Sequence, residues 1–192
     1  MATESGRADA LVVCVAGATG FVGRAVVRTL LERGHTVRAL VRDGRKAAAV
    51  LGEHERLSVF EGDASEGVGL AAWAERADAM VNTIGIIREA PGGQTFQRVH
   101  VGVVRHLTGA AKGGGVRHFV QVSALGVMDE GATAYQRSKF EGEMVVRQSG
   151  LAWTILRPSM IHGPDGEFMQ MAKGWATGRQ APFVFMPYFT RM

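Results

Sequence analysis

The sequence predicts an α/β fold in which a doubly wound parallel sheet carries helices on both faces. Apolar, β-branched runs alternate with amphipathic helical patterns along the chain, which is the rhythm of βαβ units. Glycines stand between these runs, at Gly34, Gly62 and Gly150 and in the triplet at residues 113–115. A chain of 192 residues, 46% of them hydrophobic, is long enough to bury one sizeable core.

The first strand, turn and helix span residues 11–33. Residues 11–16 are apolar and β-branched, which predicts a buried strand, and residues 21–33 have the amphipathic pattern of a helix. Between them, Gly17 allows a tight turn, Gly20 allows a ligand to approach the backbone closely, and Gly23 allows the helix to pack against the strand.

This succession predicts a cradle for the pyrophosphate of a dinucleotide, as in a Rossmann-like domain. The helix N-terminus directs free N–H groups and the positive end of its dipole toward an anion. A glycine-rich turn alone also fits a plain tight loop, but here a strand and a helix flank it. The predicted cofactor-binding residues of the turn are Gly17, Thr19, Gly20, Phe21, Val22 and Gly23.

The later elements continue the alternation in order. Strands are predicted at residues 36–41, 57–61, 79–83, 118–123 and 153–156, and helices at residues 45–51, 69–75, 94–112, 134–148 and 167–177. Right-handed crossovers place the carboxyl ends of such strands along one edge of the sheet. A ligand is expected at that edge.

Composition excludes several other classes of protein. Cys14 is the only cysteine, so neither a disulfide framework nor a cysteine-ligated metal site is expected, and His100 and His106 lack further ligands at metal spacing. No apolar run approaches the ~20 residues of a membrane span, and no signal peptide precedes the domain, which predicts a soluble, cytoplasmic protein. The net charge of +4 is spread along the chain, which does not favour nucleic acid as a partner.

The end of the second strand favours one nicotinamide nucleotide. Domains that prefer NAD usually place an acid there for the ribose 2′-hydroxyl. Here Arg42 occupies or adjoins that position, and a guanidinium suits a 2′-phosphate through charge-assisted hydrogen bonds. Arg45 and Lys46 add positive charge, whereas Asp43 leaves NAD(H) open. The sequence therefore predicts a preference for NADP(H), with a solvated basic turn as the alternative.

The third and fourth strands end in further candidate contacts. Asp63, followed by Ala64, can accept a hydrogen bond from the adenine amino group or can cap the following turn. Thr83, Ile84 and Gly85 follow the fourth strand, where a glycine allows close approach of a ribose or nicotinamide. A plain strand-to-loop turn is the competing interpretation.

Candidate catalytic residues are Ser123, Tyr135 and Lys139. The phenol and the ammonium stand four residues apart, hence on one helical face. A nearby cation stabilises a phenolate, so a tyrosine with an ordinary pKa of about 10 is expected to exchange a proton closer to neutrality. Lys139 is also expected to hold the nicotinamide ribose, and Ser123 to orient a substrate oxygen.

These motifs together resemble the short-chain dehydrogenase/reductase superfamily, in its extended and atypical NAD(P)-binding epimerase/dehydratase-like branch. Residues 17–23 match its cofactor loop, Asp63 the adenine-binding acid, residues 82–85 the fourth-strand motif, and Tyr135 with Lys139 the catalytic pair. Residues 156–159, including Pro158, match the loop beside the nicotinamide. The resemblance implies an oxidoreductase or epimerase that transfers hydride between a nicotinamide cofactor and a carbonyl or alcohol.

Within that branch, residues 94–96, 122–126 and 154–159 are similar to bacterial relatives of the 39 kDa accessory subunit of respiratory complex I. That resemblance implies a protein that holds its nucleotide structurally, and it leaves open a peripheral association with a membrane complex. An enzyme with an unknown small-molecule substrate and an accessory protein with a protein partner are both retained as hypotheses.

Two features depart from the extended members. Ser123 is followed by Ala124 and Leu125 where those enzymes often carry a further hydroxyl, which weakens the case for catalysis relative to binding. The substrate-binding part of extended members also lies largely beyond this point in the chain. The predicted regions are therefore a flexible N-terminus at 1–9, the NAD(P)-binding domain at 10–180, and the start of a truncated C-terminal substrate-binding part at 181–192.

Overall fold

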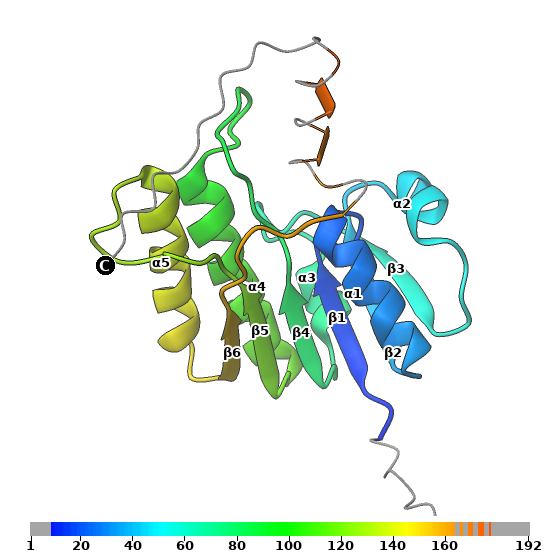
Figure 1. Cartoon of the computed structure of the whole chain (residues 1–192). Helices are drawn as coiled ribbons and strands as arrows, with labels where there is room; N and C mark the ends of the chain where they lie inside the picture. The colour runs from blue at the N-terminus through cyan, green and yellow to red at the C-terminus, as the bar shows by residue number, and fades with distance from the viewer. Residues whose placement is uncertain (1–8, 164–165, 167–168, 171–172, 175–176, 178–192) are drawn as a thin grey trace, which may run out of the picture. The chain divides into compact units, whose positions relative to one another are not determined.

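The computed structural model describes residues 9–163, 166, 169–170, 173–174 and 177. Its centre is a fully parallel sheet of six strands in the order β3-β2-β1-β4-β5-β6 (Figure 1). The strands are β1 Val12–Ala16, β2 Thr36–Val41, β3 Leu57–Glu61, β4 Ala79–Asn82, β5 His118–Val122 and β6 Ala152–Leu156. The predicted doubly wound α/β class is confirmed.

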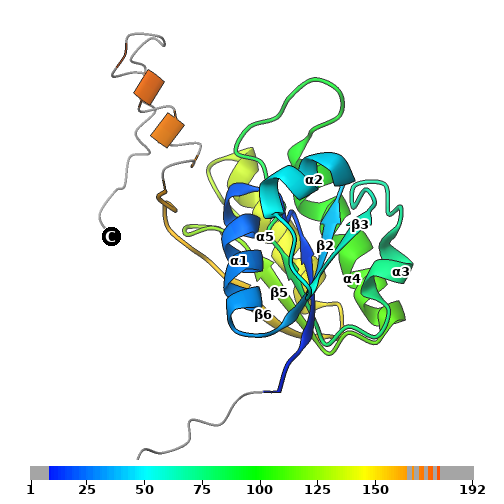
Figure 2. The ribbon, with the colours of Figure 1, turned by 90° about the vertical axis from the view of Figure 1, so that its right-hand side faces the viewer.

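Helices cover both faces of this sheet. They are α1 Phe21–Glu32, α2 Gly44–Leu51, α3 Leu70–Ala74, the π-helical turn η1 Gln97–Gly102, α4 Val103–Gly114 and α5 Ala134–Arg147. Seen along the sheet edge, α1 lies on one side of the strands and α3 and α4 lie on the other (Figure 2). Apolar side chains fill both interfaces: Val15 and Val27 belong to the cluster under α1, while Trp73, Leu107 and Phe119 belong to the opposite cluster.

The strand order reverses at β1, which pairs with β2 on one side and with β4 on the other. Ala16 at the end of β1 stands level with Leu40 of β2 and with Asn82 of β4. The crossovers leaving β1 and β4 therefore diverge, and a crevice is left at the carboxyl ends of the strands. The sheet topology alone places a ligand site between residues 17–20 and residues 83–86.

The helix expected at residues 94–112 differs most from the sequence prediction. Its first part, Gln97–Gly102, is a π-helical turn, and α4 begins only at Val103 and ends at Gly114. Apolar spacing does not distinguish a π turn from an α turn, because both bury the same side of the helix. The other described elements agree with the prediction to within one or two residues at each end. The helix expected at 167–177 lies largely outside the described residues.

The chain divides into two compact units, Met1–Ser159 and Met160–Met192. The first unit contains the whole sheet. The described residues of the second include a helical hydrogen bond from the Gln170 N–H to the Gly166 carbonyl, 3.0 Å. The domain boundary expected at residue 180, and the segment 181–192, lie outside the described residues and stay predictions.

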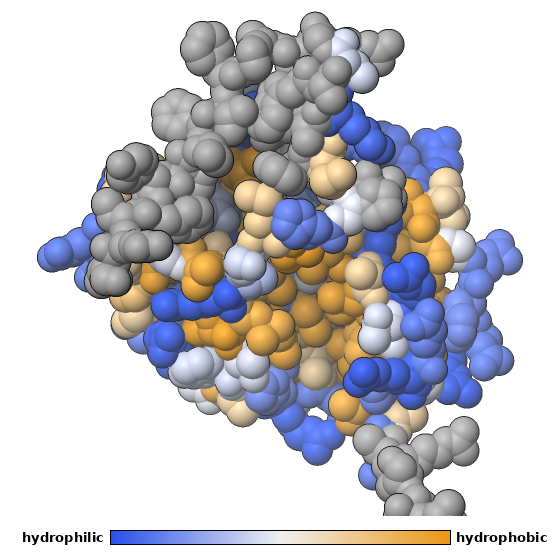
Figure 3. Space-filling model, in the orientation of Figure 1, coloured by the Kyte–Doolittle hydropathy of each residue, from blue (hydrophilic) through white to orange (hydrophobic). Residues whose placement is uncertain are grey.

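The sheet face that carries α1 is only partly covered. No helix of the described part of the first unit lies over β5 and β6 on this face, where Val120 and Val122 are half-buried and Leu156 is 50% exposed. Apolar side chains gather beside α1 in the space-filling view (Figure 3). Among the described helices, none is long and apolar enough to cross a membrane.

Candidate functional site

A cavity of about 470 Å³ opens at the carboxyl ends of the strands, at the reversal of strand order. It brings together predicted residues from four separate turns of the chain. Those that line it are Gly17, Thr19, Gly20, Arg42, Asp63, Ala64, Thr83, Ile84 and Gly85. Phe21, Val22 and Gly23 form the first turn of α1, next to Gly20.

The glycine turn has the geometry of an anion cradle. Gly17 has a φ of +78°, and a side chain there would lie 2.7 Å from the Thr83 hydroxyl oxygen. A Cβ on Gly23 would overlap the Gly17 carbonyl, so only glycine lets α1 begin this close to the strand. The first turn of α1 receives no side-chain cap at Gly20, which leaves its N–H groups to a ligand.

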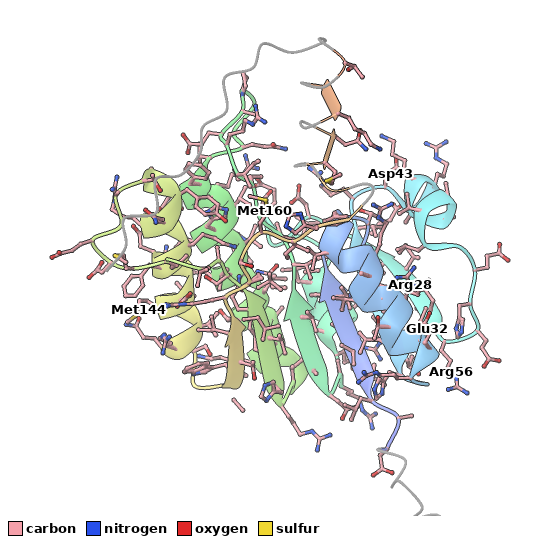
Figure 4. All side chains as sticks on the ribbon, in the orientation of Figure 1. Arg28, Glu32, Asp43, Arg56, Met144 and Met160 are labelled. Carbon is pink, nitrogen blue, oxygen red and sulfur yellow. The ribbon has the colours of Figure 1, made fainter. Side chains whose placement is uncertain are left out.

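Arg42 and Asp43 have different roles at the end of β2. The Asp43 carboxylate caps α2, accepting from the N–H groups of Arg45 at 3.0 Å and Lys46 at 3.2 Å. It lies at the start of that helix in Figure 4. Arg42 is exposed and lines the cavity. Asp43, the acid that could favour NAD(H), is thus engaged in a helix cap. The Arg42 guanidinium remains at the cavity wall.

Asp63 both caps its turn and lines the cavity. Its Oδ1 accepts from the Ser65 N–H at 2.8 Å and from the Ser65 hydroxyl at 2.7 Å. The Ser65 hydroxyl is the main reason why the pKa of Asp63 lies below its usual range, and the charges of Arg42 and Arg98 lower it further. Asp63 is therefore an ionised hydrogen-bond acceptor at neutral pH.

Sequence reasoning missed one wall of the cavity. Gly92 and Gly93 line it, although the sequence indicates only a break between elements there. Arg98 of η1 closes this wall, donating to the Gly93 carbonyl at 3.4 Å and the Ser65 hydroxyl at 3.3 Å, and pairing with Glu66. No spacing rule connects these residues, because the contact depends on how the long loop after β4 folds back.

The Tyr135–Lys139 pair stands at the start of α5. A capping box between Thr133 and Gln136 fixes this helix start, so the two side chains share one face. Lys139 is 7% exposed, and its Nζ donates to the Val122 carbonyl at 3.0 Å. A side chain on Gly85 would lie 3.5 Å from that Nζ, so the ammonium reaches the loop that lines the cavity.

Burial governs the proton affinities of this pair. It lowers the pKa of Lys139 to about 8, against the opposing charge of Glu143. It raises the pKa of Tyr135 above its ordinary value. Burial of the half-buried phenol thus acts against the expected lowering of the Tyr135 pKa by the neighbouring cation.

Ser123 is committed to a buried network. Its hydroxyl donates to Glu143 Oε1 at 2.6 Å, and Arg157 binds both oxygens of that fully buried carboxylate at 2.8 and 2.6 Å. Burial alone raises the pKa of Glu143, but the hydrogen bonds from Arg157 and Ser123 outweigh it and hold the pKa below its usual range. The only proton of the Ser123 hydroxyl thus points to Glu143 in this arrangement.

Pro158 lies in the loop that follows β6. Its carbonyl accepts from the Leu125 N–H at 2.8 Å, and the Leu156 carbonyl accepts from the Ser123 N–H at 2.7 Å. These bonds join the loops that follow β5 and β6. They place Pro158 near the β5 loop, and its predicted contact with the nicotinamide stays a prediction.

Comparisons with known proteins agree with this geometry. A family model described as NAD(P)H-binding matches residues 17–177. A ceramide reductase of Caulobacter vibrioides is 34% identical over 153 residues, covering 80% of this chain and 47% of that protein. The mouse protein NADH dehydrogenase [ubiquinone] 1 alpha subcomplex subunit 9, mitochondrial, is 30% identical over 184 residues, covering 94% of this chain and 48% of that protein.

Solved structures share the fold. The Bordetella bronchiseptica enzyme WbmH in complex with NAD+ superposes with a TM-score of 0.73 at 21% identity, over 88% of this chain and 64% of that one. The chain spans about half the length of the two curated relatives above. The matched family model, the glycine cradle and the parallel sheet lead to one assignment. The chain belongs to the NAD(P)H-binding family, within the short-chain dehydrogenase/reductase superfamily.

Proposed function

We propose that the chain is the cofactor-binding part of an NADP(H)-dependent oxidoreductase in which Tyr135 exchanges the proton with a carbonyl or alcohol substrate. The observation that carries this proposal is the placement of Tyr135 and Lys139 on one face of α5, with Lys139 Nζ buried beside Gly85 at the cavity edge. A phenol and an ammonium in this relation form an acid/base pair.

Each side chain has a defined task in this proposal. A nicotinamide nucleotide, when bound, supplies or accepts the hydride. The Tyr135 hydroxyl gives its proton to the oxygen of a carbonyl that is being reduced, and takes it back in the reverse direction. The Lys139 ammonium binds a ribose hydroxyl and stabilises the phenolate that remains. Ser123 supports the site through Glu143 and leaves the substrate oxygen to Tyr135.

Two observations support NADP(H) over NAD(H). Arg42 lines the cavity, and Asp43 is engaged as the cap of α2. A guanidinium at the ribose end attracts a 2′-phosphate, and the Asp43 carboxylate is held by two backbone N–H groups. In this proposal, the positive charge of Arg42 selects NADP(H) over NAD(H).

Replacing Tyr135 by Phe tests the proposed reaction. The variant keeps the aromatic ring but lacks the hydroxyl, so NADPH affinity should stay within twofold while turnover falls by about 10² to 10⁴, the usual contribution of a positioned general acid. NADPH oxidation against a panel of ketones and aldehydes measures turnover, and fluorescence titration measures affinity. Equal turnover in both proteins would remove Tyr135 from the mechanism.

A second candidate function is that of a nucleotide-binding accessory protein. The hydrogen bond from the Ser123 hydroxyl to Glu143 favours it, because Ala124 and Leu125 directly follow Ser123 and supply no second hydroxyl there. The similarity to the mouse subunit supports it as well. A nucleotide that copurifies with the protein and keeps its redox state in the presence of every tested carbonyl would favour this function over the first.

A further inference from the structure

We infer that His100 is a positioning residue that fixes Tyr135 relative to the cofactor-lining loop after β4; the inference rests on the proposed function. Sequence reasoning assigns no role to His100 beyond the absence of metal ligands around it. In the structure, its side chain touches both elements whose relative placement the proposed proton transfer requires. It is buried, with 3% of its surface exposed.

The first set of contacts joins His100 to α5. His100 Nδ1 lies 2.9 Å from the Ser138 hydroxyl, which itself donates to the Tyr135 carbonyl at 2.9 Å. The imidazole ring also meets the Tyr135 ring edge-on, with ring centres 5.4 Å apart. Phe96 stacks on His100 with ring centres 5.3 Å apart and meets Tyr135 edge-on at 5.8 Å. The three rings pack mutually, and edge-to-face contacts of this kind fix ring orientation.

The second contact joins His100 to the loop after β4. His100 Nε2 lies 3.2 Å from the Ile86 backbone nitrogen and 3.1 Å from the Ile86 carbonyl oxygen. Either neutral tautomer joins the two elements. With the proton on Nδ1, Nε2 accepts from the Ile86 N–H; with the proton on Nε2, the ring donates to the Ile86 carbonyl and Nδ1 accepts from the Ser138 hydroxyl. Ile86 lines the cavity together with Gly85. One neutral imidazole thus connects the cavity wall to the helix of Tyr135 by hydrogen bonds from its two ring nitrogens.

His100 also stands close to Lys139 without competing for its charge. A side chain on Gly85 would lie 3.5 Å from Lys139 Nζ and 3.9 Å from His100 Nε2. Burial first, and then the Lys139 charge, lower the pKa of His100 to about 4, so the ring is neutral at physiological pH. A neutral ring keeps its contacts with Ile86 and Ser138 and places no second positive charge beside the Lys139 ammonium.

The backbone is adapted to this placement. His100 lies in the π-helical turn η1, and such turns occur frequently at functional sites. Gly142 of α5 faces the His100 carbonyl so closely that a Cβ there would overlap it. The π turn and the glycine together let η1 and α5 approach until the imidazole reaches both Ser138 and Ile86.

Tyrosine NMR tests this inference without a known substrate. The chain has only two tyrosines, Tyr135 and Tyr188, so labelling the tyrosine ring carbon that bears the hydroxyl gives two signals, and Tyr135→Phe assigns them. The readout is the change that saturating NADPH causes in the Tyr135 signal. His100→Phe keeps an aromatic ring but loses both hydrogen bonds, so this change should be lost and the dissociation constant for NADPH should rise about tenfold.

Matched variants separate positioning from general stability. His100→Gln restores one donor and one acceptor and should recover part of the NADPH response. His118→Asn is the control, because His118 is hydrogen-bonded to Thr154 at the amino end of β5, away from the site; its NADPH response should match the wild type. If His100→Phe does not fold, Ser138→Ala removes the same connection to Tyr135 and replaces it in the comparison.

The outcomes distinguish the two proposals. An unaltered NADPH response in His100→Phe, or a wild-type Tyr135 signal that ignores NADPH, would overturn the positioning role. If Tyr135→Phe leaves turnover intact while His100→Phe still abolishes the NADPH response, the proposed reaction fails and the positioning role holds.

Discussion

Arg42 is the residue on which cofactor preference is expected to depend. It is exposed at the cavity wall, and removing its guanidinium takes away the charge-assisted bonds to a 2′-phosphate. We predict that Arg42→Ala weakens NADPH binding by about 1–3 kcal/mol and leaves NADH binding nearly unchanged. Titration of both nucleotides against both proteins measures this difference.

Arg45→Ala is the matched control for that experiment. Arg45 lies three residues away in the first turn of α2, where its N–H donates to Asp43. Its removal should lower the affinity for NADPH much less than the removal of Arg42. Equal losses for NADPH and NADH in Arg42→Ala would show that the side chain does not read the 2′-phosphate.

Individual residues were predictable where a local spacing defines them. The glycines of the first turn and the pair Tyr135–Lys139 follow from rules of i+3 or i+4 spacing. Gly17 and Gly20 line the cavity, and Lys139 Nζ reaches the Gly85 loop at its edge. The partners of Ser123 were not predictable in this way. Glu143 reaches it from α5 and Arg157 from the loop after β6, and their hydrogen bonds depend on burial, which the sequence does not display.

At the level of elements, strand positions were the most predictable feature. β1, at the centre of the sheet, is buried on both faces, so it is a short, continuous apolar run bounded by turn residues. The region between β4 and α4 was the least predictable. It contains a glycine-rich loop that lines the cavity and a π turn, and neither produces a distinctive periodicity. The missed residues Gly93, Arg98 and His100 all lie there.

Alanine substitutions at two helical glycines are expected to change the free energy of unfolding in opposite directions. A Cβ at Gly142 would overlap the His100 carbonyl, so Gly142→Ala should push α5 from η1 and lower the free energy of unfolding by about 1–3 kcal/mol. Gly109 of α4 is exposed with open space around it, so Gly109→Ala should raise the free energy of unfolding by about 0.5–1 kcal/mol.

Urea denaturation of both variants measures the two changes. Both variants replace a helical glycine by alanine, so both gain the same helix propensity. The difference between their free energies of unfolding therefore reports the contact between α5 and η1. If Gly142→Ala is as stable as Gly109→Ala, the two elements do not approach as closely as described.

For the whole molecule, buried titratable groups predict loss of stability in acid. His100 has a pKa of about 4 in the folded protein against 6.5 when unfolded, so the unfolded chain binds more protons between these values. The free energy of unfolding should therefore fall as the pH is lowered from about 6.5 to 4, by about 3 kcal/mol from this group at 1.36 kcal/mol per pH unit. Ionised Asp63 and Glu143, with pKa values below their usual range, extend the loss to lower pH.

Denaturation midpoints between pH 4 and pH 7 measure this dependence. His100→Gln has no titrating group at this position and should flatten the profile above pH 4.5. His54→Asn removes an exposed histidine and should keep the wild-type slope. An unchanged slope in His100→Gln would assign the acid sensitivity to other groups.

The strand order also determines how the sheet can assemble during synthesis. β1 is made first and stands in the interior; β2 and β3 then add to one side of it, and β4, β5 and β6 add in turn to the other. Every strand therefore joins an edge that is already open, and none has to be inserted between two paired strands. A nascent chain that leaves the ribosome at about 5–20 residues per second can thus enter its native pairings in the order in which they are translated.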